Sequence, residues 1–186
     1  MSLYEIAFFH PVGAHVGESL EAIITRKQAE IREHGHTFWS FASATPGRVQ
    51  LWRQELQRAQ ASECPVICCG SSTKDPQRQK ADEYWATEWS FDQRHWQKLP
   101  ERVTNYHRPA RNGILASAFM VKDIAVPQDR VIRRPSHWLA MTPIEWRTTT
   151  VPTRGEYLVR GVEAEAAGSR VRLVLTAADP FVVWIR

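Results

Sequence analysis

Hydrophobic positions recur at helical spacing in two segments near the N-terminus. The apolar residues of segment 19–34 fall on one helical face, and Ser19 is suited to cap that helix. Gly35 then supplies a residue that commonly ends a helix. Pro46 fits the first position of a second amphipathic segment, 46–60, which carries apolar residues on one side. The pattern therefore predicts two helices, at residues 19–34 and 46–60.

Short apolar or aromatic runs elsewhere predict strands, because they are bounded by glycine, proline and polar turn residues. Turns are expected at Glu163–Ser169 and at Asp179–Pro180. The predicted strands are Tyr4–His10, Thr37–Ser43, Pro65–Cys69, Ile114–Ile124, Tyr157–Val162, Arg170–Leu175 and Phe181–Ile185.

The segment at about 73–112 has no sustained period, so we expect a long irregular excursion there. Its interleaved aromatic and basic residues are compatible with a binding loop or with a cover over the core. With two helices and several short strands, the chain is predicted to be one α+β domain, residues 1–186. We expect a strongly bent mixed sheet or a small β-barrel with the two helices packed on it.

Composition supports a globular protein and leaves its partner open. The chain has 186 residues, of which 43% are hydrophobic and 24% charged. A net charge of +4 permits a polyanionic partner, although acidic and basic residues alternate along 26–33 as on an ordinary exposed helix face. Eight tryptophans serve either core packing or the stacking of a flat ligand.

Cysteine and histidine spacing predicts a reducing compartment and no metal site. The three cysteines, at positions 64, 68 and 69, do not form a disulfide framework, and no C-x-x-C or clustered histidine pattern is present. Segment 1–5 has no signal-peptide pattern, and no apolar stretch is long enough to span a membrane. We therefore expect a cytoplasmic protein without membrane attachment, metal or cofactor.

Segment 25–32 resembles the G-x-K-x-x-E-x-R signature of ASCH domains, a PUA-like family. Lys27, Glu30 and Arg32 match the signature, whereas Thr25 replaces its glycine and the local pattern here is helical rather than extended. The resemblance implies a PUA-like fold with a cleft and a function in binding RNA or modified nucleosides. EVE relatives are thought to hold a modified base in an aromatic-lined pocket.

The aromatic run after the first helix supplies the candidate pocket. A base is expected to stack on aromatic rings while hydroxyl and backbone groups read its polar edge. Trp39 is expected to stack on the ligand beside a glycine- and serine-rich turn that, with a lysine, is suited to hold phosphate. The candidate binding residues are Trp39, Ser40, Phe41, Gly70, Ser71, Ser72, Lys74 and Arg111. The predicted function is binding of nucleic acid or of a modified nucleotide in this cleft.

Two other classes of function remain open. Some ASCH proteins resemble amidohydrolases of acylated nucleosides, which makes Lys27 and Glu30 a candidate acid-base pair. A cysteine nucleophile at Cys68 or Cys69 with a histidine is a weaker enzymatic interpretation, because cysteine on an apolar strand is usually inert. The third class is a protein-interaction domain whose tryptophans form an apolar patch.

Overall fold

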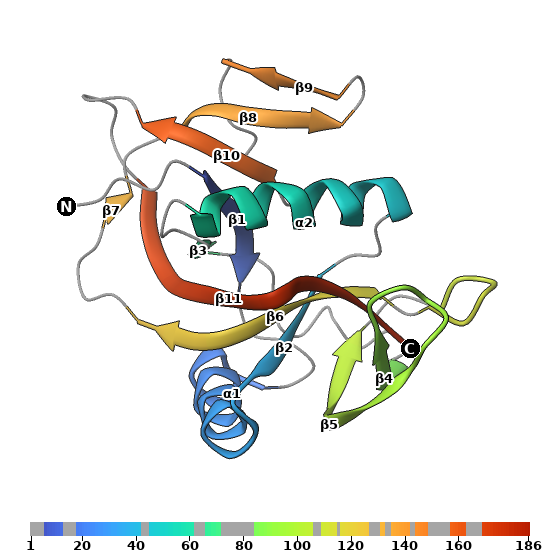
Figure 1. Ribbon diagram of the computed structural model, residues 1–186. Coiled ribbons are helices and arrows are strands. Elements are labelled where there is room, and N and C mark those ends of the chain that lie inside the picture. Colours follow the sequence, from blue (N-terminus) through green and yellow to red (C-terminus); the bar gives the residue numbers. More distant parts are fainter. Residues whose placement is uncertain are drawn as a thin grey trace. The chain divides into compact units, whose positions relative to one another are not determined.

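The computed structural model confirms an α+β fold (Figure 1). The residues that it describes contain two helices and a mostly antiparallel sheet with one parallel strand pair. Among these residues, no helix is both long and apolar enough to cross a lipid bilayer. The described residues are 6–12, 18–41, 45–61, 66–71, 84–105, 109–114, 116–126, 131–132, 135–141, 144–148, 157–162 and 169–186.

The chain divides into two compact units, each assembled from three separate segments. Unit 1 contains Met1–Val12, Gln54–Ser72 and Ile124–Thr176, and unit 2 contains the remaining segments. The second helix, α2 (Pro46–Ala61), and the last strand, β11 (Ser169–Ile185), each contribute residues to both units. The segments of unit 2 are Gly13–Arg53, Thr73–Asp123 and Ala177–Arg186.

Unit 1 contains a mixed sheet in the order β11-β3-β1-β10-β8-β9. β1 and β3 are parallel, and the other neighbouring strands in this series are antiparallel. A short strand, β7 (Val131–Ile132), pairs with the beginning of β11. The remaining bounds are β1 (Ile6–Val12), β3 (Val66–Ser71), β8 (Pro135–Met141), β9 (Ile144–Arg147) and β10 (Tyr157–Val162).

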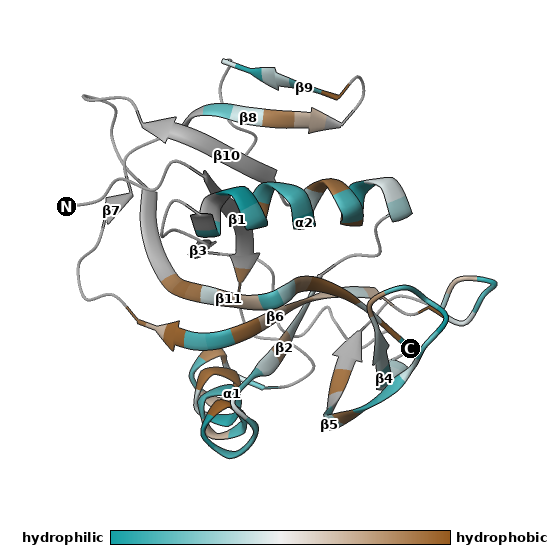
Figure 2. Ribbon diagram, viewed as in Figure 1, coloured by the Kyte–Doolittle hydropathy of each residue, from teal (hydrophilic) through white to brown (hydrophobic). Residues whose placement is uncertain are grey.

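The described part of unit 2 contains the first helix and antiparallel strands. Strand β2 pairs with β6, and β4 pairs with both β5 and the end of β11. Buried apolar side chains from all five strands form one cluster, which includes Phe38, Met120 and Val183. Figure 2 shows the hydrophobic residues at the end of β11 in brown. The bounds are α1 (Leu20–His34), β2 (Thr37–Phe41), β4 (Tyr84–Ser90), β5 (Gln97–Asn105) and β6 (Ala116–Ala125).

Both predicted helices are confirmed, together with the Ser19 and Gly35 caps that the sequence indicated. The Ser19 hydroxyl accepts the Ala22 N–H at 3.2 Å, and Gly35 ends α1 with a left-handed φ of 78°. At the start of α2, the Thr45 hydroxyl accepts the Arg48 N–H at 3.4 Å. α2 buries an apolar face, whose members are Val49, Trp52 and Leu56.

The segment expected to be an irregular excursion instead contains the β4–β5 hairpin. The two strands pair with a register shift between Ala86 and Glu88, and Pro100 lies inside β5. A register shift and a proline both interrupt the simple alternation by which a strand is recognised in sequence. The prediction of irregular structure across this segment was therefore wrong for residues 84–90 and 97–105.

The C-terminal strands differ from the prediction in a related way. The runs 170–175 and 181–185 belong to the single strand β11, and no turn divides them. The Asp179–Pro180 peptide bond is cis and Phe181 has a φ of 65°, both within β11. The turn expected at 163–169 falls mainly outside the described residues, and the β8–β9 hairpin was not predicted.

Candidate functional site

A pocket of about 310 Å³ lies in unit 2, beside helix α1 and the β4–β5 hairpin. It is lined by Glu18, Arg26, Glu30, Trp85 and Glu101. This volume is at the lower end of the range for small-molecule sites. A concave site with several convergent polar groups is the usual starting point for assigning a function.

Of the three residues that match the ASCH-like signature, helix α1 places Glu30 in the lining of this pocket and Lys27 beside Glu30, whereas Arg32 is exposed and is not a lining residue. Lys27 and Glu30 are three positions apart and Arg26 and Glu30 four apart, spacings that place side chains on neighbouring parts of a helix surface. Lys27 and Glu30 are buried although both carry charge, with 7% and 9% of their surface exposed. Buried charged side chains require partners, and the partners come from β2 and β5.

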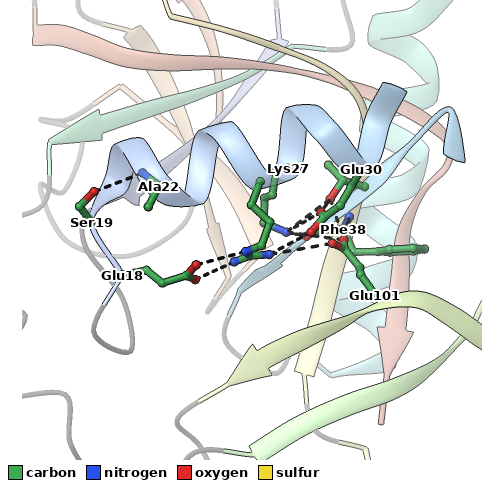
Figure 3. A network of polar contacts seen from close by, with 9 residues as sticks. Glu18, Ser19, Ala22, Lys27, Glu30, Phe38 and Glu101 are labelled. Atoms are coloured by element: carbon green, nitrogen blue, oxygen red, sulfur yellow. Dashed lines mark hydrogen bonds and ion pairs between the residues drawn. The ribbon is translucent and has the colours of Figure 1, made fainter. Parts of the chain in front are cut away.

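Lys27 lies at the centre of the polar network in Figure 3. Its ammonium donates a hydrogen bond to the Phe38 carbonyl and lies 3.4 Å from the Thr37 hydroxyl. It is 3.8 Å from a carboxylate oxygen of Glu30 and 3.8 Å from one of Glu101. Burial lowers the pKa of Lys27 to about 8, although attraction to the Glu30 charge opposes this shift.

The Thr37 hydroxyl joins the two buried carboxylates. Its oxygen lies 2.5 Å from Glu30 Oε2 and 2.8 Å from Glu101 Oε1. A threonine hydroxyl has one proton to donate, so rotation of this group directs its hydrogen bond to one carboxylate or the other. Thr37 therefore connects two carboxylates of the pocket wall to each other and to Lys27.

Arg26 closes the network on its exposed side. Its Nη2 lies 2.8 Å from Glu18 Oε2, and its Nη1 lies 3.0 Å from Glu30 Oε1. The hydrogen bond to Glu18 is the main cause that raises the Arg26 pKa above its ordinary value. Its Nη1 is 3.9 Å from Glu101 Oε2, which is too far for a hydrogen bond. That buried oxygen accepts no hydrogen bond from any described residue.

The aromatic component of the pocket is Trp85 on β4. Its surface is 48% exposed, and it lines the pocket with the four charged residues. An indole with an accessible surface can stack on a flat ring or contact a cation. Trp85 therefore gives the pocket a place for the apolar part of a ligand.

The structure brings together some of the predicted site residues and places others elsewhere. Trp39 on β2 is buried, with the Lys27 ammonium 5.7 Å from the centre of its ring, and it is not a lining residue of the pocket. Ser40 follows it on β2 and is partly exposed. Phe41 ends β2, with its side chain outside the described part, and Arg111 lies exposed in the turn between β5 and β6.

The predicted phosphate-holding turn belongs to a different part of the chain. Gly70 and Ser71 lie within strand β3 of unit 1, where they pair with Pro11 and Val12. Ser72 and Lys74 lie outside the described residues. The binding role of this segment and of Trp39 stays a prediction.

Several residues of the site were not identified from sequence. Arg26 lies within the signature segment and Thr37 follows that segment closely. Both could have been found from the sequence by considering the polar residues near the signature. Glu101 lies 64 residues after Thr37, in a polar segment where nothing distinguishes it from its neighbours. Only the folded arrangement of β2 and β5 brings its carboxylate to Lys27.

In comparisons with known proteins, no family model matches this chain, and no curated protein or solved structure is significantly similar to it. The resemblance to the ASCH signature therefore depends on residues 25–32 alone.

Proposed function

We propose that unit 2 is a hydrolase of an amide bond in a small acylated nucleoside-like compound. The observation that carries the proposal is the buried Lys27 ammonium beside a hydroxyl that joins two pocket carboxylates. Groups with altered proton affinity that converge on a pocket are typical of acid-base catalysis. The resemblance of segment 25–32 to ASCH domains supports the same reaction class.

The geometry supports a division of roles between pocket wall and interior. Glu30 lines the pocket and is the candidate base that accepts a proton from the attacking water and passes it to the amine nitrogen as the C–N bond breaks, so that the products are the carboxylate and the free amine. The Thr37 hydroxyl, 2.5 Å from Glu30 and 3.4 Å from Lys27, carries protons between them. Lys27 does not line the pocket, so it acts through Thr37 as a proton reservoir whose pKa of about 8 suits exchange near neutral pH.

The test is release of acetate from a panel of N-acetylated nucleosides by the full chain. We expect Glu30→Gln and Lys27→Met to lower kcat/KM by about 10²-fold or more, the usual contribution of acid-base catalysis. Lys122→Met is the matched control, because Lys122 is an exposed lysine on β6 of the same unit. The proposal fails if wild type releases no acetate, or if Lys27→Met and Lys122→Met behave alike.

The second candidate function is binding of a modified base or nucleotide without turnover. The exposed Trp85 indole beside the charged pocket residues favours it, because ring stacking contributes to base recognition without chemistry. Retention of a nucleoside with no product, and loss of that retention in Trp85→Ala, supports binding over hydrolysis. A nucleic-acid partner is part of this second proposal.

We also propose a PUA-like barrel for the fold and the cytoplasm for the location of the protein. A PUA-like barrel is supported by the short signature and by the order of a strand, a helix and further strands. A cytoplasmic location is supported by the cysteine spacing, which suits a reducing compartment.

A further inference from the structure

One carboxylate oxygen of the pocket lacks the hydrogen bonds that a buried charge requires. Glu101 has a side chain that is 10% exposed, and its Oε2 accepts no hydrogen bond from any described residue. Arg26 Nη1 lies 3.9 Å from this oxygen, beyond hydrogen-bond distance. A buried acceptor without a donor costs free energy. A ligand that donates an N–H hydrogen bond to this oxygen removes that cost, which favours its binding.

The lining of the pocket is negative as a whole. Three carboxylates, those of Glu18, Glu30 and Glu101, line it with one guanidinium, that of Arg26, and the Lys27 ammonium lies outside the lining, 3.8 Å from Glu30 and from Glu101, so carboxylates outnumber cations by three to two. A concave surface lined mainly by one sign of charge concentrates ligands of the opposite sign. The pocket therefore attracts a cation and repels phosphate or carboxylate.

Two neighbouring groups indicate the shape of that cation. Arg26 already places a planar nitrogen cation against Glu30, with Nη1 3.0 Å from Oε1, so planar N–H donors match this wall. Trp85 adds a 48% exposed indole, whose surface favours a flat ring or a cation. Arg26 is itself 39% exposed and its Nη1 lies 3.9 Å from the buried Glu101 Oε2, so a ligand reaches this oxygen only where the guanidinium moves aside.

We propose that the pocket selects unphosphorylated ligands that carry a planar, cationic nitrogen group, of the amidinium or guanidinium class, beside a flat ring. The nitrogen group donates hydrogen bonds to Glu101 Oε2, and the ring packs on Trp85. This names a class of ligand for the site described under the proposed function. The inference rests on that proposal for the location of the site and not for the reaction.

The test uses three small probes of nearly equal shape: benzamidine, neutral benzamide and anionic benzoate. Binding to the full chain is measured by calorimetry and by chemical-shift titration. We expect benzamidine to bind at least about tenfold more tightly than benzamide, because its hydrogen bonds to carboxylates are charge-assisted. Benzoate should show no binding at the same concentrations.

Variants assign the selectivity to particular residues. Glu101→Gln should weaken benzamidine binding by at least about tenfold, whereas Glu33→Gln removes the same charge from an exposed position of α1 and should leave it unchanged. Arg26→Ala should tighten binding, because it removes the resident cation while leaving three carboxylates. Weaker binding in Arg26→Ala contradicts this model of competition.

Equal affinity of the wild type for benzamidine and benzamide overturns the proposal. An equal loss of benzamidine affinity in Glu101→Gln and Glu33→Gln overturns it as well. If Glu101→Gln does not fold, the wild-type comparison of the three probes still decides. Benzamidine selectivity without amide hydrolysis supports the ligand class and removes the amidohydrolase. Hydrolysis of acylated nucleosides without this selectivity supports the amidohydrolase and removes the ligand class.

Discussion

Replacing Lys27 by methionine tests whether burial or ion pairing dominates at the centre of the network. Lys27 has a pKa of about 8 in the folded chain, against 10.5 for an ordinary lysine. A lowered lysine pKa means that the unfolded chain binds more protons between these values, so folding becomes more favourable as pH rises from about 8 to 10.5. The corresponding free energy is about 3 kcal/mol, at roughly 1.4 kcal/mol for each pH unit.

The assay is urea unfolding of wild type and Lys27→Met at half-unit steps from pH 7 to pH 10.5. The stability of wild type relative to Lys27→Met should rise across this window, because the cost of the buried ammonium disappears as it loses its proton. Exposed lysines titrate in both proteins and cancel in the difference, and Lys122→Met serves as the control. A difference in unfolding free energy that does not change with pH refutes the reasoning. A difference that falls as pH rises shows that attraction of the Lys27 ammonium to Glu30 and Glu101 outweighs the cost of its burial.

Three other substitutions test separate parts of unit 2, each measured by the urea midpoint or the melting temperature. Thr37→Val removes the hydroxyl between the two carboxylates and should destabilise the fold by roughly 1–3 kcal/mol. An unchanged urea midpoint would show that this hydroxyl does not stabilise the buried carboxylates. Ser19→Ala removes the N-cap of α1 and should cost about 1 kcal/mol; a neutral result shows that the cap contributes nothing. Arg53→Met removes hydrogen bonds to the Val182 and Phe91 carbonyls, at 2.6 and 2.8 Å, and should lower the melting temperature. Equal melting temperatures of wild type and variant would show that Arg53 does not hold the 91–96 loop in place.

The sequence predicted local structure best where a single periodic pattern determined it. Helix α1 was predicted with both ends, because its cap, its apolar face and its terminal glycine all lie within one short segment. The β4–β5 hairpin was missed because a register shift and Pro100 hide its alternation. β11 was divided in two because Asp179–Pro180 carries the residue types of a turn.

The candidate site was predictable only in part, for a similar reason. Lys27 and Glu30 were found because they share one helix and match a short signature. Glu101 completes the network from a strand far along the chain, and no local pattern indicates which distant carboxylate meets a given lysine. The exposure of Trp85 and the burial of Trp39 likewise depend on tertiary packing, which composition alone does not reveal.

The most direct measurement of the central claim is the pH dependence of kcat/KM for hydrolysis of an N-acetylated nucleoside. If neutral Lys27 receives protons from the pocket carboxylates through Thr37, kcat/KM should rise with pH and level off above a pKa of about 8. Lys27→Met should remove this step from the profile, while Lys122→Met should retain it. A wild-type profile that is flat from pH 6.5 to 9.5, or one that Lys27→Met leaves unchanged, contradicts the assignment of Lys27 to the reaction.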